Sequence, residues 1–351
     1  MMSLWDALRM NMMISYQELV RTFPRMKSNP IKLKLNPDFQ RKYKWDQDGW
    51  LRSSKFIESC LMRIPLPSCY FAEDDSGNHI VIDGVQRLTT IQKFFDDEFA
   101  LEGMTTFKEL EGKKFSELGS LRSELESTTI RCIVLRKENP KKLIREIFSR
   151  LNQGAVKLSD QEIRHALYPG GFDELLEELG NIDAIKNFGL AETTTVKRDS
   201  REPDEQVLRF FAFYEDNFFD CFDSSLKEFL DDHMEKFSDL KDDELNIMRE
   251  RFKTSLSKCE KIFGEDVFTN PTVRRKRKGL VHYDILMPTI GKLNDDIVNE
   301  KSEQIRNAWF TLCSSAEFKK TLSGGLQNKS SVMKRRASWV ALLKEVIDGK
   351  Y

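Results

Sequence analysis

Residues 80–95 read IVIDGVQRLTTIQKFF, and this stretch decides how the first half of the chain folds. Its β-branched run predicts a strand that ends at Asp83, and Gly84 relaxes the backbone for a tight turn. An amphipathic helical pattern begins within three residues of that glycine. The stretch therefore predicts a strand, a short turn and a helix. The helix positions expected to face inward are Leu88, Ile91, Phe94 and Phe95.

The turn between this strand and helix carries three chemically active side chains. The first N–H groups of a helix have no partner within the helix and lie at the positive end of its dipole, so they bind anions, phosphate above all. Arg87 is placed to hold such an anion, Gln86 to orient a water or a hydroxyl, and Asp83 to bind a divalent cation or accept a proton. The alternative is that Asp83 caps the helix, Gly84 eases the turn and Arg87 is a solvated surface residue.

The composition is that of a soluble globular protein large enough for two or three domains. The chain has 351 residues, of which 40% are hydrophobic and 32% charged. No apolar run is long enough to cross a bilayer, so no membrane partner is expected. The six cysteines and four histidines are dispersed without a CxxC pair. This pattern predicts reduced thiols in a cytoplasmic protein and argues against a zinc site.

The two halves of the chain differ in their periodicity. In the first half, residues 15–23 predict a short helix, whereas residues 31–39 and 128–136 predict strands. Beyond residue 171 one helical pattern follows another, with little proline or glycine. The expected fold class is α+β, with a mixed α/β domain over residues 1–170 and an all-helical domain over residues 171–351.

A second cluster, FQRKYKW at residues 39–45, interleaves cations with aromatic side chains. This combination suits the face of a base or sugar next to a phosphate. The alternative is an exposed basic loop in which Tyr43 and Trp45 pack inward.

A third cluster, FSRLNQGAVKLSDQEIR, spans residues 148–164. It places Arg150 and Asn152 at the end of one helix and Arg164 on the next, which Ser159 and Glu162 open as a capping box. The alternatives are again structural, because Arg150 suits a helix C-terminus and Asn152 suits a local cap. Arg164 would then form a surface ion pair with Asp160 or Glu174.

Taken in this order, the three clusters resemble the motifs of the domain of unknown function 262 family. That family includes the N-terminal halves of GmrSD-type modification-dependent restriction enzymes and of the phosphorothioate-sensing SspE protein. The resemblance covers roughly residues 15–170 and implies a ParB/sulfiredoxin-like fold with a nucleotide pocket. One position departs from the family's DGQQR pattern, since Val85 replaces the first glutamine. This replacement puts hydrolysis in question if that amide contacts the nucleotide.

The resemblance also implies roles for individual residues. Asp83, Gln86 and Arg87 match the hydrolytic motif, and phosphate chemistry suggests Mg²⁺ with Asp83 as its ligand. Glu162 matches the third motif as well. The implied nucleotide- or phosphate-binding residues are Gln40, Arg41, Tyr43, Trp45, Gly84, Arg150, Asn152 and Arg164.

The function implied is a nucleoside-triphosphate-binding and hydrolysing module of a prokaryotic antiphage defence or modification-dependent restriction system. Its expected partners are the nucleotide, modified or foreign double-stranded DNA and a separate nuclease subunit. Nuclease chemistry within this chain is not expected, because His233 and His282 are the only histidines after residue 171. The alternatives are a regulatory protein switched by nucleotide without hydrolysis and, less favoured, a stand-alone DNase.

A basic run in the second half is the candidate DNA contact. VRRKRKGLVHY at residues 273–283 holds five successive cations that suit a phosphate backbone. The alternative is a solvated loop, which the net acidic second half favours. The five residues are Arg274, Arg275, Lys276, Arg277 and Lys278.

Overall fold

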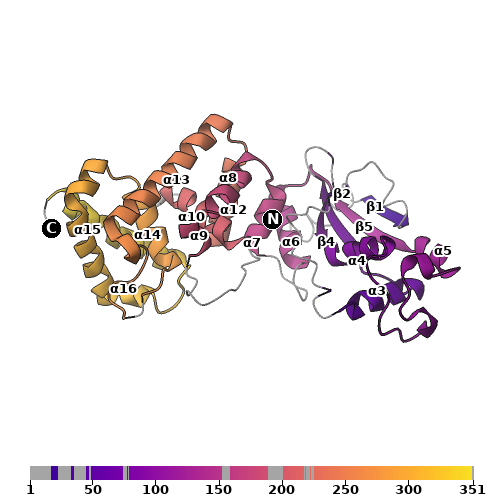
Figure 1. Ribbon diagram of the computed structural model, residues 1–351. Coiled ribbons are helices and arrows are strands. Elements are labelled where there is room, and N and C mark those ends of the chain that lie inside the picture. Colours follow the sequence, from indigo (N-terminus) through magenta and orange to yellow (C-terminus); the bar gives the residue numbers. More distant parts are fainter. Residues whose placement is uncertain are drawn as a thin grey trace. The chain divides into compact units, whose positions relative to one another are not determined.

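The computed structural model describes most of the chain, which forms two compact units, residues 1–158 and 159–351. The first is a mixed α/β unit and the second is helical, as expected (Figure 1). No described helix is long and apolar enough to cross a membrane. The described residues are 17–22, 33–34, 45–46, 49–73, 77, 79–151, 159–188, 201–216, 218, 222, 225–274 and 276–349.

The first unit is built on a five-stranded mixed sheet whose strand order is β1-β5-β3-β4-β2. The central strand β3 runs antiparallel to β4, which precedes the turn at Gly84, and parallel to β5. Of the edge strands, β1 pairs antiparallel with β5 and β2 pairs parallel with β4. The bounds are β1 Gln17–Thr22, β2 Leu33–Lys34, β3 Cys69–Glu73, β4 His79–Asp83 and β5 Thr129–Leu135.

The expected helix at residues 15–23 was wrong, because residues 17–22 form β1. The sequence QELVRT has no strong helical period, and its register with β5, from Gln17 opposite Val134 to Thr22 opposite Thr129, gives its backbone groups partners in the sheet. The strands predicted for this half were confirmed, since β2, β4 and β5 lie within or overlap the predicted ranges.

The two faces of the sheet are covered by different helices of the first unit. Alternate residues of the strands point to opposite faces, so Val81 packs with α3 and α4 while Ile82 points the other way. Helix α6 packs against β4 and buries Phe148. The helices are α3 Leu51–Leu61, α4 Val85–Phe95, α5 Leu121–Glu126 and α6 Lys141–Leu151, with short 3-10 turns at Lys108–Leu110 and Phe115–Glu117.

A buried carboxylate fixes the loop beside α3. Glu58 Oε1 accepts the backbone N–H groups of Thr105, Thr106 and Phe107 at 2.9, 2.6 and 3.2 Å, and Oε2 accepts the Thr105 hydroxyl at 3.0 Å. Burial raises the pKa of this carboxyl, but the hydrogen bonds lower it more, so the net pKa lies below its usual value. The ionised carboxylate therefore holds the loop.

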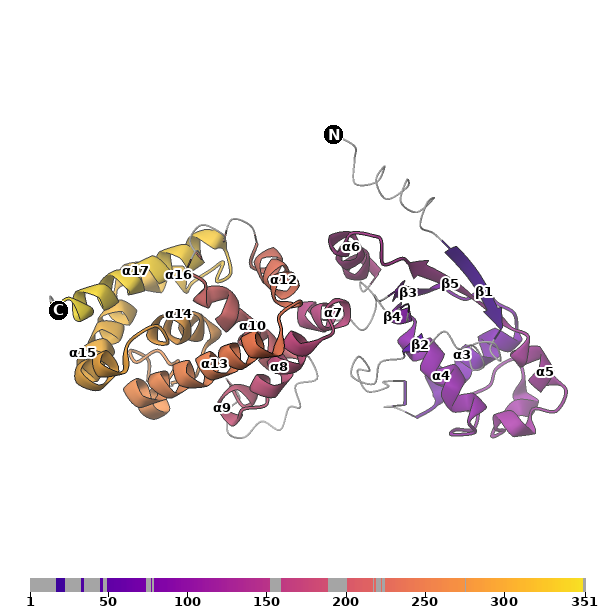
Figure 2. The ribbon, with the colours of Figure 1, turned by 90° about the horizontal axis from the view of Figure 1, so that it is seen from above.

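The second unit has one large core rich in phenylalanine, to which its helices contribute their apolar faces. Helix α15 lies antiparallel to α17, since Lys301 near the start of α15 donates to the carbonyls of Val346 and Ile347 at the end of α17 (Figure 2). The bounds are α7 Asp160–Leu167, α8 Gly171–Gly180, α9 Asp183–Lys186, α10 Glu202–Tyr214, α12 Leu226–Phe237, α13 Asp242–Phe263, α14 Leu280–Ile290, α15 Asp295–Ser314, α16 Ala316–Thr321 and α17 Lys329–Ile347.

Candidate functional site

The turn between β4 and α4 has the geometry that the sequence predicted. Asp83 ends β4, Gly84 is the N-cap of α4, and the helix begins at Val85. The φ of Gly84 is +107°, a value that side chains with a Cβ rarely adopt. A Cβ at this position would also lie 2.5 Å from Sγ of Cys69, which packs directly against the turn. Two independent constraints therefore require glycine here.

Arg87 is held firmly on the first turn of α4. Its Nη2 donates to Oδ2 of Asp83 at 2.6 Å and to the carbonyl of Ser68 at 3.3 Å, and its Nη1 donates to the carbonyl of Pro67. The Arg87 side chain is 13% exposed and that of Asp83 is 40% exposed. A guanidinium has five N–H donors, so two remain beyond these three bonds. Arg87 is thus a fixed, partly buried cation rather than a solvated surface residue.

The start of α4 is not neutralised by its own sequence. No described side chain caps α4, and its first turn contains no acidic residue. The dipole's positive end therefore lies next to the Arg87 guanidinium, whose charge Asp83 offsets in part. Gln86 is half-buried beside it. Val85 is partly buried against the core of the first unit, so the residue that departs from the family's pattern has a packing role.

Cys69 supports the turn and is chemically inert. Burial raises the pKa of its thiol to about 12, and the nearby Arg87 guanidinium offsets this only in part. The thiol is therefore neutral at physiological pH and acts as a small apolar group under Gly84. Sequence reasoning did not identify Cys69 or the Pro67–Ser68 carbonyls as parts of the site, because these contacts join β3 to the helix that follows β4.

Trp45 is described by the structure and packs locally. Its ring makes an edge contact with Phe56 of α3 at 5.7 Å, and the guanidinium of Arg52 lies 5.0 Å from its centroid. Its carbonyl accepts the Ser53 hydroxyl at 3.4 Å. This is the packing alternative described for the 39–45 cluster. The ring is half-buried, so a ligand role for Trp45 stays a prediction.

Arg150 lies in the last turn of α6, where the dipole favours a cation. Its Nε donates to Oε1 of Glu146 at 2.8 Å, one turn earlier, and its side chain is 44% exposed. Helix α6 packs against β4, the strand that ends at Asp83. Arg150 therefore belongs to the same unit as the turn, and its predicted role in phosphate binding stays a prediction.

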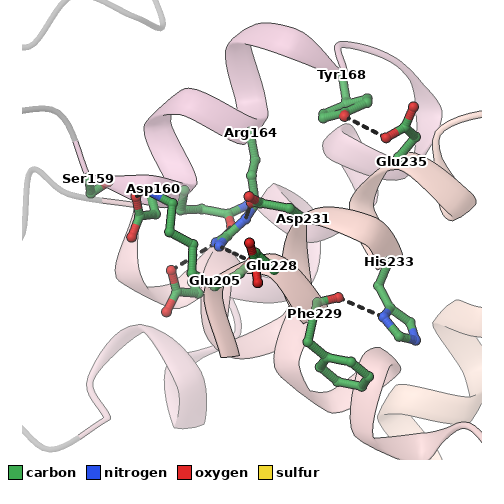
Figure 3. A network of polar contacts seen from close by, with 12 residues as sticks. Ser159, Asp160, Arg164, Tyr168, Glu205, Glu228, Phe229, Asp231, His233 and Glu235 are labelled. Atoms are coloured by element: carbon green, nitrogen blue, oxygen red, sulfur yellow. Dashed lines mark hydrogen bonds and ion pairs between the residues drawn. The ribbon is translucent and has the colours of Figure 1, made fainter. Parts of the chain in front are cut away.

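Arg164 belongs to the second unit, on α7, and is 1% exposed (Figure 3). Its Nε donates to Oδ1 of Asp231 at 2.7 Å, and its Nη1 to Oε2 of Glu205 at 3.0 Å and Oε1 of Gln161 at 3.1 Å. The proposed surface pair with Asp160 or Glu174 was therefore wrong. The guanidinium serves two carboxylates within the second unit, and its predicted role as a phosphate ligand stays a prediction.

The same ion pairs continue across the helical unit. Oε1 of Glu205 lies 3.8 Å from Nη1 of Arg209, whose Nε donates to Oδ1 of Asp284 at 2.9 Å. Acids and arginines thus alternate from Asp231 through Arg164, Glu205 and Arg209 to Asp284, which we call the charge chain. It links α12, α7, α10 and α14. The capping box of Ser159 and Glu162, which opens α7, is confirmed.

The basic run is partly neutralised where it is described. Nζ of Lys276 pairs with Oδ2 of Asp266, and the backbone of Lys278 forms an antiparallel bridge with Thr269. Arg274 and Arg277 are exposed. A DNA contact at this run stays a prediction.

Five residues of the predicted site fall outside the described residues: Gln40, Arg41, Tyr43, Asn152 and Arg275. Among the described residues, no three histidine, cysteine or acidic side chains are grouped to hold a metal ion. The structure brings together Asp83, Gly84, Gln86 and Arg87 at one turn.

Fold and turn together define the class. The first unit is a mixed α/β domain with a strand–turn–helix motif at Gly84, followed by a helical unit. Residues 25–169 match the family described as the GmrSD restriction endonuclease, N-terminal domain, which is the domain of unknown function 262 family. The family relates the chain to the modules of restriction and defence systems. No curated protein and no solved structure matches the chain.

Proposed function

We propose that the first unit binds the phosphates of a nucleoside triphosphate at the β4–α4 turn and hydrolyses the terminal one. The chain would act in the cytoplasm as the nucleotide-driven module of a restriction system that responds to DNA. The observation that carries this proposal is the turn itself. There an uncapped helix start, a fixed guanidinium and an exposed carboxylate converge within five residues.

Each side chain of the turn has a distinct role in this proposal. The first N–H groups of α4 and the remaining donors of Arg87 would bind phosphate oxygens, where negative charge builds up as the terminal phosphoryl group leaves. Gln86, half-buried next to them, would orient the attacking water. Gly84 allows the tight turn that brings Asp83 and Arg87 together, because its backbone adopts a φ of +107°.

Asp83 fits the part of a magnesium ligand. Mg²⁺ is usually held by one or two carboxylates together with substrate phosphates, and Asp83 offers a carboxylate that is 40% exposed at the end of β4. Bound there, the ion would neutralise charge on the phosphate oxygens. Arg87 would meanwhile keep the Asp83 carboxylate in place through its 2.6 Å ion pair.

A second candidate is a switch that binds nucleotide without hydrolysing it. Two observations favour it: Val85 packs against the core instead of presenting an amide, and three of the donors of Arg87 are already used by Asp83 and two carbonyls. A ParB/sulfiredoxin-like arrangement of the first unit, and a separate nuclease subunit that performs cleavage, are further parts of the proposal.

Phosphate release separates these candidates. ATP, GTP, CTP and UTP are each supplied with magnesium, with and without duplex DNA, to the wild type and to Arg87→Gln, Gln86→Ala and Arg122→Gln. The Arg122 variant is the matched control, because Arg122 forms a comparable i,i+4 pair with Glu126 in the same unit. We expect the wild type to turn over at least one nucleotide. Arg87→Gln should lower this turnover by roughly 100-fold or more, whereas Arg122→Gln should not.

The remaining outcomes are equally informative. Nucleotide binding without turnover in the wild type supports the switch. If the wild type neither binds nor hydrolyses any of the four nucleotides, Asp83 and Arg87 have a purely structural role and the proposal is refuted.

A further inference from the structure

The second unit contains a polar groove of about 440 Å³ between α13 and α15 that has no part in the β4–α4 turn. The two helices pack against each other, and Figure 2 shows α15 at the C-terminal end of α13. Most of the side chains that line this groove carry hydrogen-bond donors. The lining residues are Lys253, Thr254, Ser257, Lys258, Lys261, Asp295, Val298 and Asn299.

The three lysines of this groove differ in how firmly they are held. Lys258 is 14% exposed and donates to the carbonyl of Leu293 at 2.6 Å, with Asp295 at 3.2 Å. Nζ of Lys261 contacts Oδ1 of Asn299, a neutral partner. Three ammonium groups and one carboxylate leave an excess of two positive charges. Among the described residues, the groove therefore has one cation that is held in place, Lys258, and a second, Lys261, whose partner is a neutral amide.

Lys253 contributes a third charge that is only weakly compensated. Its Nζ lies 3.8 Å from Oε1 of Glu178, but that carboxylate already accepts two bonds from Nε of Arg249 at 3.0 and 2.9 Å. Lys253 is 47% exposed. An exposed pair at this distance contributes little, so the Lys253 ammonium is available to another anion.

Two hydroxyls in the groove add to this donor set. Helical serines and threonines commonly donate to the carbonyl four residues earlier, as Ser255 does to Arg251 at 2.7 Å. The hydroxyls of Thr254 and Ser257 make no such bond with any described residue. Both are exposed and line the groove. They supply neutral donors next to the ammonium groups, and both kinds of donor are common in contacts to phosphate.

The spacing of these donors favours a phosphate backbone over a single small ligand. Lys253 and Lys261 are eight residues apart on one helix, which is about 12 Å. One DNA strand rises roughly 3.4 Å per nucleotide, so this distance corresponds to three or four nucleotide steps along a strand. None of the described residues that line the groove is aromatic, and Val298 is its single apolar member, so nothing is placed to hold a base.

We propose that the α13–α15 groove binds the phosphate backbone of duplex DNA, independently of sequence. This inference deepens the proposed function, on which its biological meaning rests, by naming the surface through which DNA is sensed. It is distinct from the basic run at residues 273–283, where Lys276 is already paired with Asp266.

Fluorescence anisotropy with a short labelled duplex tests the groove on the full chain. The variant is Lys253→Gln/Lys261→Gln, and the charge-matched control is Lys319→Gln/Lys320→Gln on α16, whose lysines are also exposed. Lys258 is not replaced, because its ammonium group donates to the carbonyl of Leu293 and its loss could change the fold of the second unit. Binding is measured from about 50 to 200 mM salt, where each phosphate contact adds about 0.9 to the slope of log K against log salt.

We expect the groove variant to lower the slope by about 1.8 and the control to leave it unchanged. Counterion release alone then predicts about 60-fold weaker binding at 0.1 M salt. An unchanged slope, an equal loss in the control, or no binding of duplex by the wild type overturns the inference. So does displacement of the duplex by equimolar tripolyphosphate, which would assign the groove to a small polyphosphate.

Nucleotide turnover without DNA is measured on the same samples. Neither groove lysine lies in the first unit, so turnover should be equal in all three proteins. If the wild type has no turnover but the groove variant still loses DNA, the proposed function fails while this inference stands. If turnover persists and the groove variant binds DNA as well as the wild type, the proposed function stands while this inference fails.

Discussion

Replacing Gly84 with alanine tests the geometry of the β4–α4 turn directly. A φ of +107° imposes backbone strain of about 1–3 kcal/mol on a residue with a Cβ. The new Cβ would also lie 2.5 Å from Sγ and 3.1 Å from Cβ of Cys69, and overpacking of this kind costs about 1–3 kcal/mol. Gly84→Ala should therefore destabilise the first unit by about 2–6 kcal/mol.

A double-mutant cycle separates the two contributions. Cys69→Ala removes the sulfur and costs roughly 1 kcal/mol by itself. In that background, Gly84→Ala should cost about 1–2 kcal/mol less than in the wild type, because the closest contact is gone while the backbone strain remains. The control is Gly112→Ala, where φ is +75° but nothing lies within 4 Å of the new Cβ, so only strain is expected.

Urea unfolding followed by tryptophan fluorescence gives the free energies. Hydrogen exchange of peptides covering residues 79–95 assigns the change to the first unit. Equal costs of Gly84→Ala with and without the Cys69 sulfur would refute the contact. A cost no larger than that of Gly112→Ala would refute the combined constraint on this turn.

Three further predictions rest on buried polar groups. Glu58→Gln should lower the free energy of unfolding by about 1–3 kcal/mol near neutral pH. Because the pKa of Glu58 in the folded protein lies below 4.5, the wild type should be more stable than the variant above pH 4.5 in urea unfolding. This difference should vanish as the pH falls through the folded pKa. Arg164→Met should cost about 3–5 kcal/mol by removing the buried cation that pairs with Asp231 and Glu205, against less than about 1 kcal/mol for the surface variant Lys227→Met, and equal thermal stabilities would contradict this. Burial raises the pKa of Cys60 and Cys69 to about 12, so mass spectrometry should find both unlabelled by iodoacetamide at pH 8 until urea is added, and labelling of the native protein would contradict it.

Local sequence patterns predicted the elements that local interactions determine. The β4–turn–α4 stretch and the helical nature of the second unit were predicted correctly, because hydrophobic period, turn residues and caps act over a few positions. The same patterns misidentified β1, whose partner β5 lies more than a hundred residues later. The pairing of Cys69 with Gly84 was invisible for the same reason.

Charged residues were harder to place than apolar ones. Arg164 was expected to bind a phosphate or to pair on the surface, whereas its partners Glu205 and Asp231 are 41 and 67 residues away in the sequence. A basic side chain has no periodicity that reveals its partner. The lysines of the α13–α15 groove escaped notice because they are spread over one helix and become a group only when α15 packs beside it.

The charge chain constrains how this protein can diverge. Each inner link, Arg164, Glu205 or Arg209, faces an oppositely charged neighbour on both sides. Losing one of these charges removes an oppositely charged partner from each neighbour. We therefore expect substitutions in the charge chain to be tolerated when several residues change together, and not one at a time. Descendants of this sequence are expected either to keep the whole series of charges or to replace it wholesale with apolar side chains of similar volume.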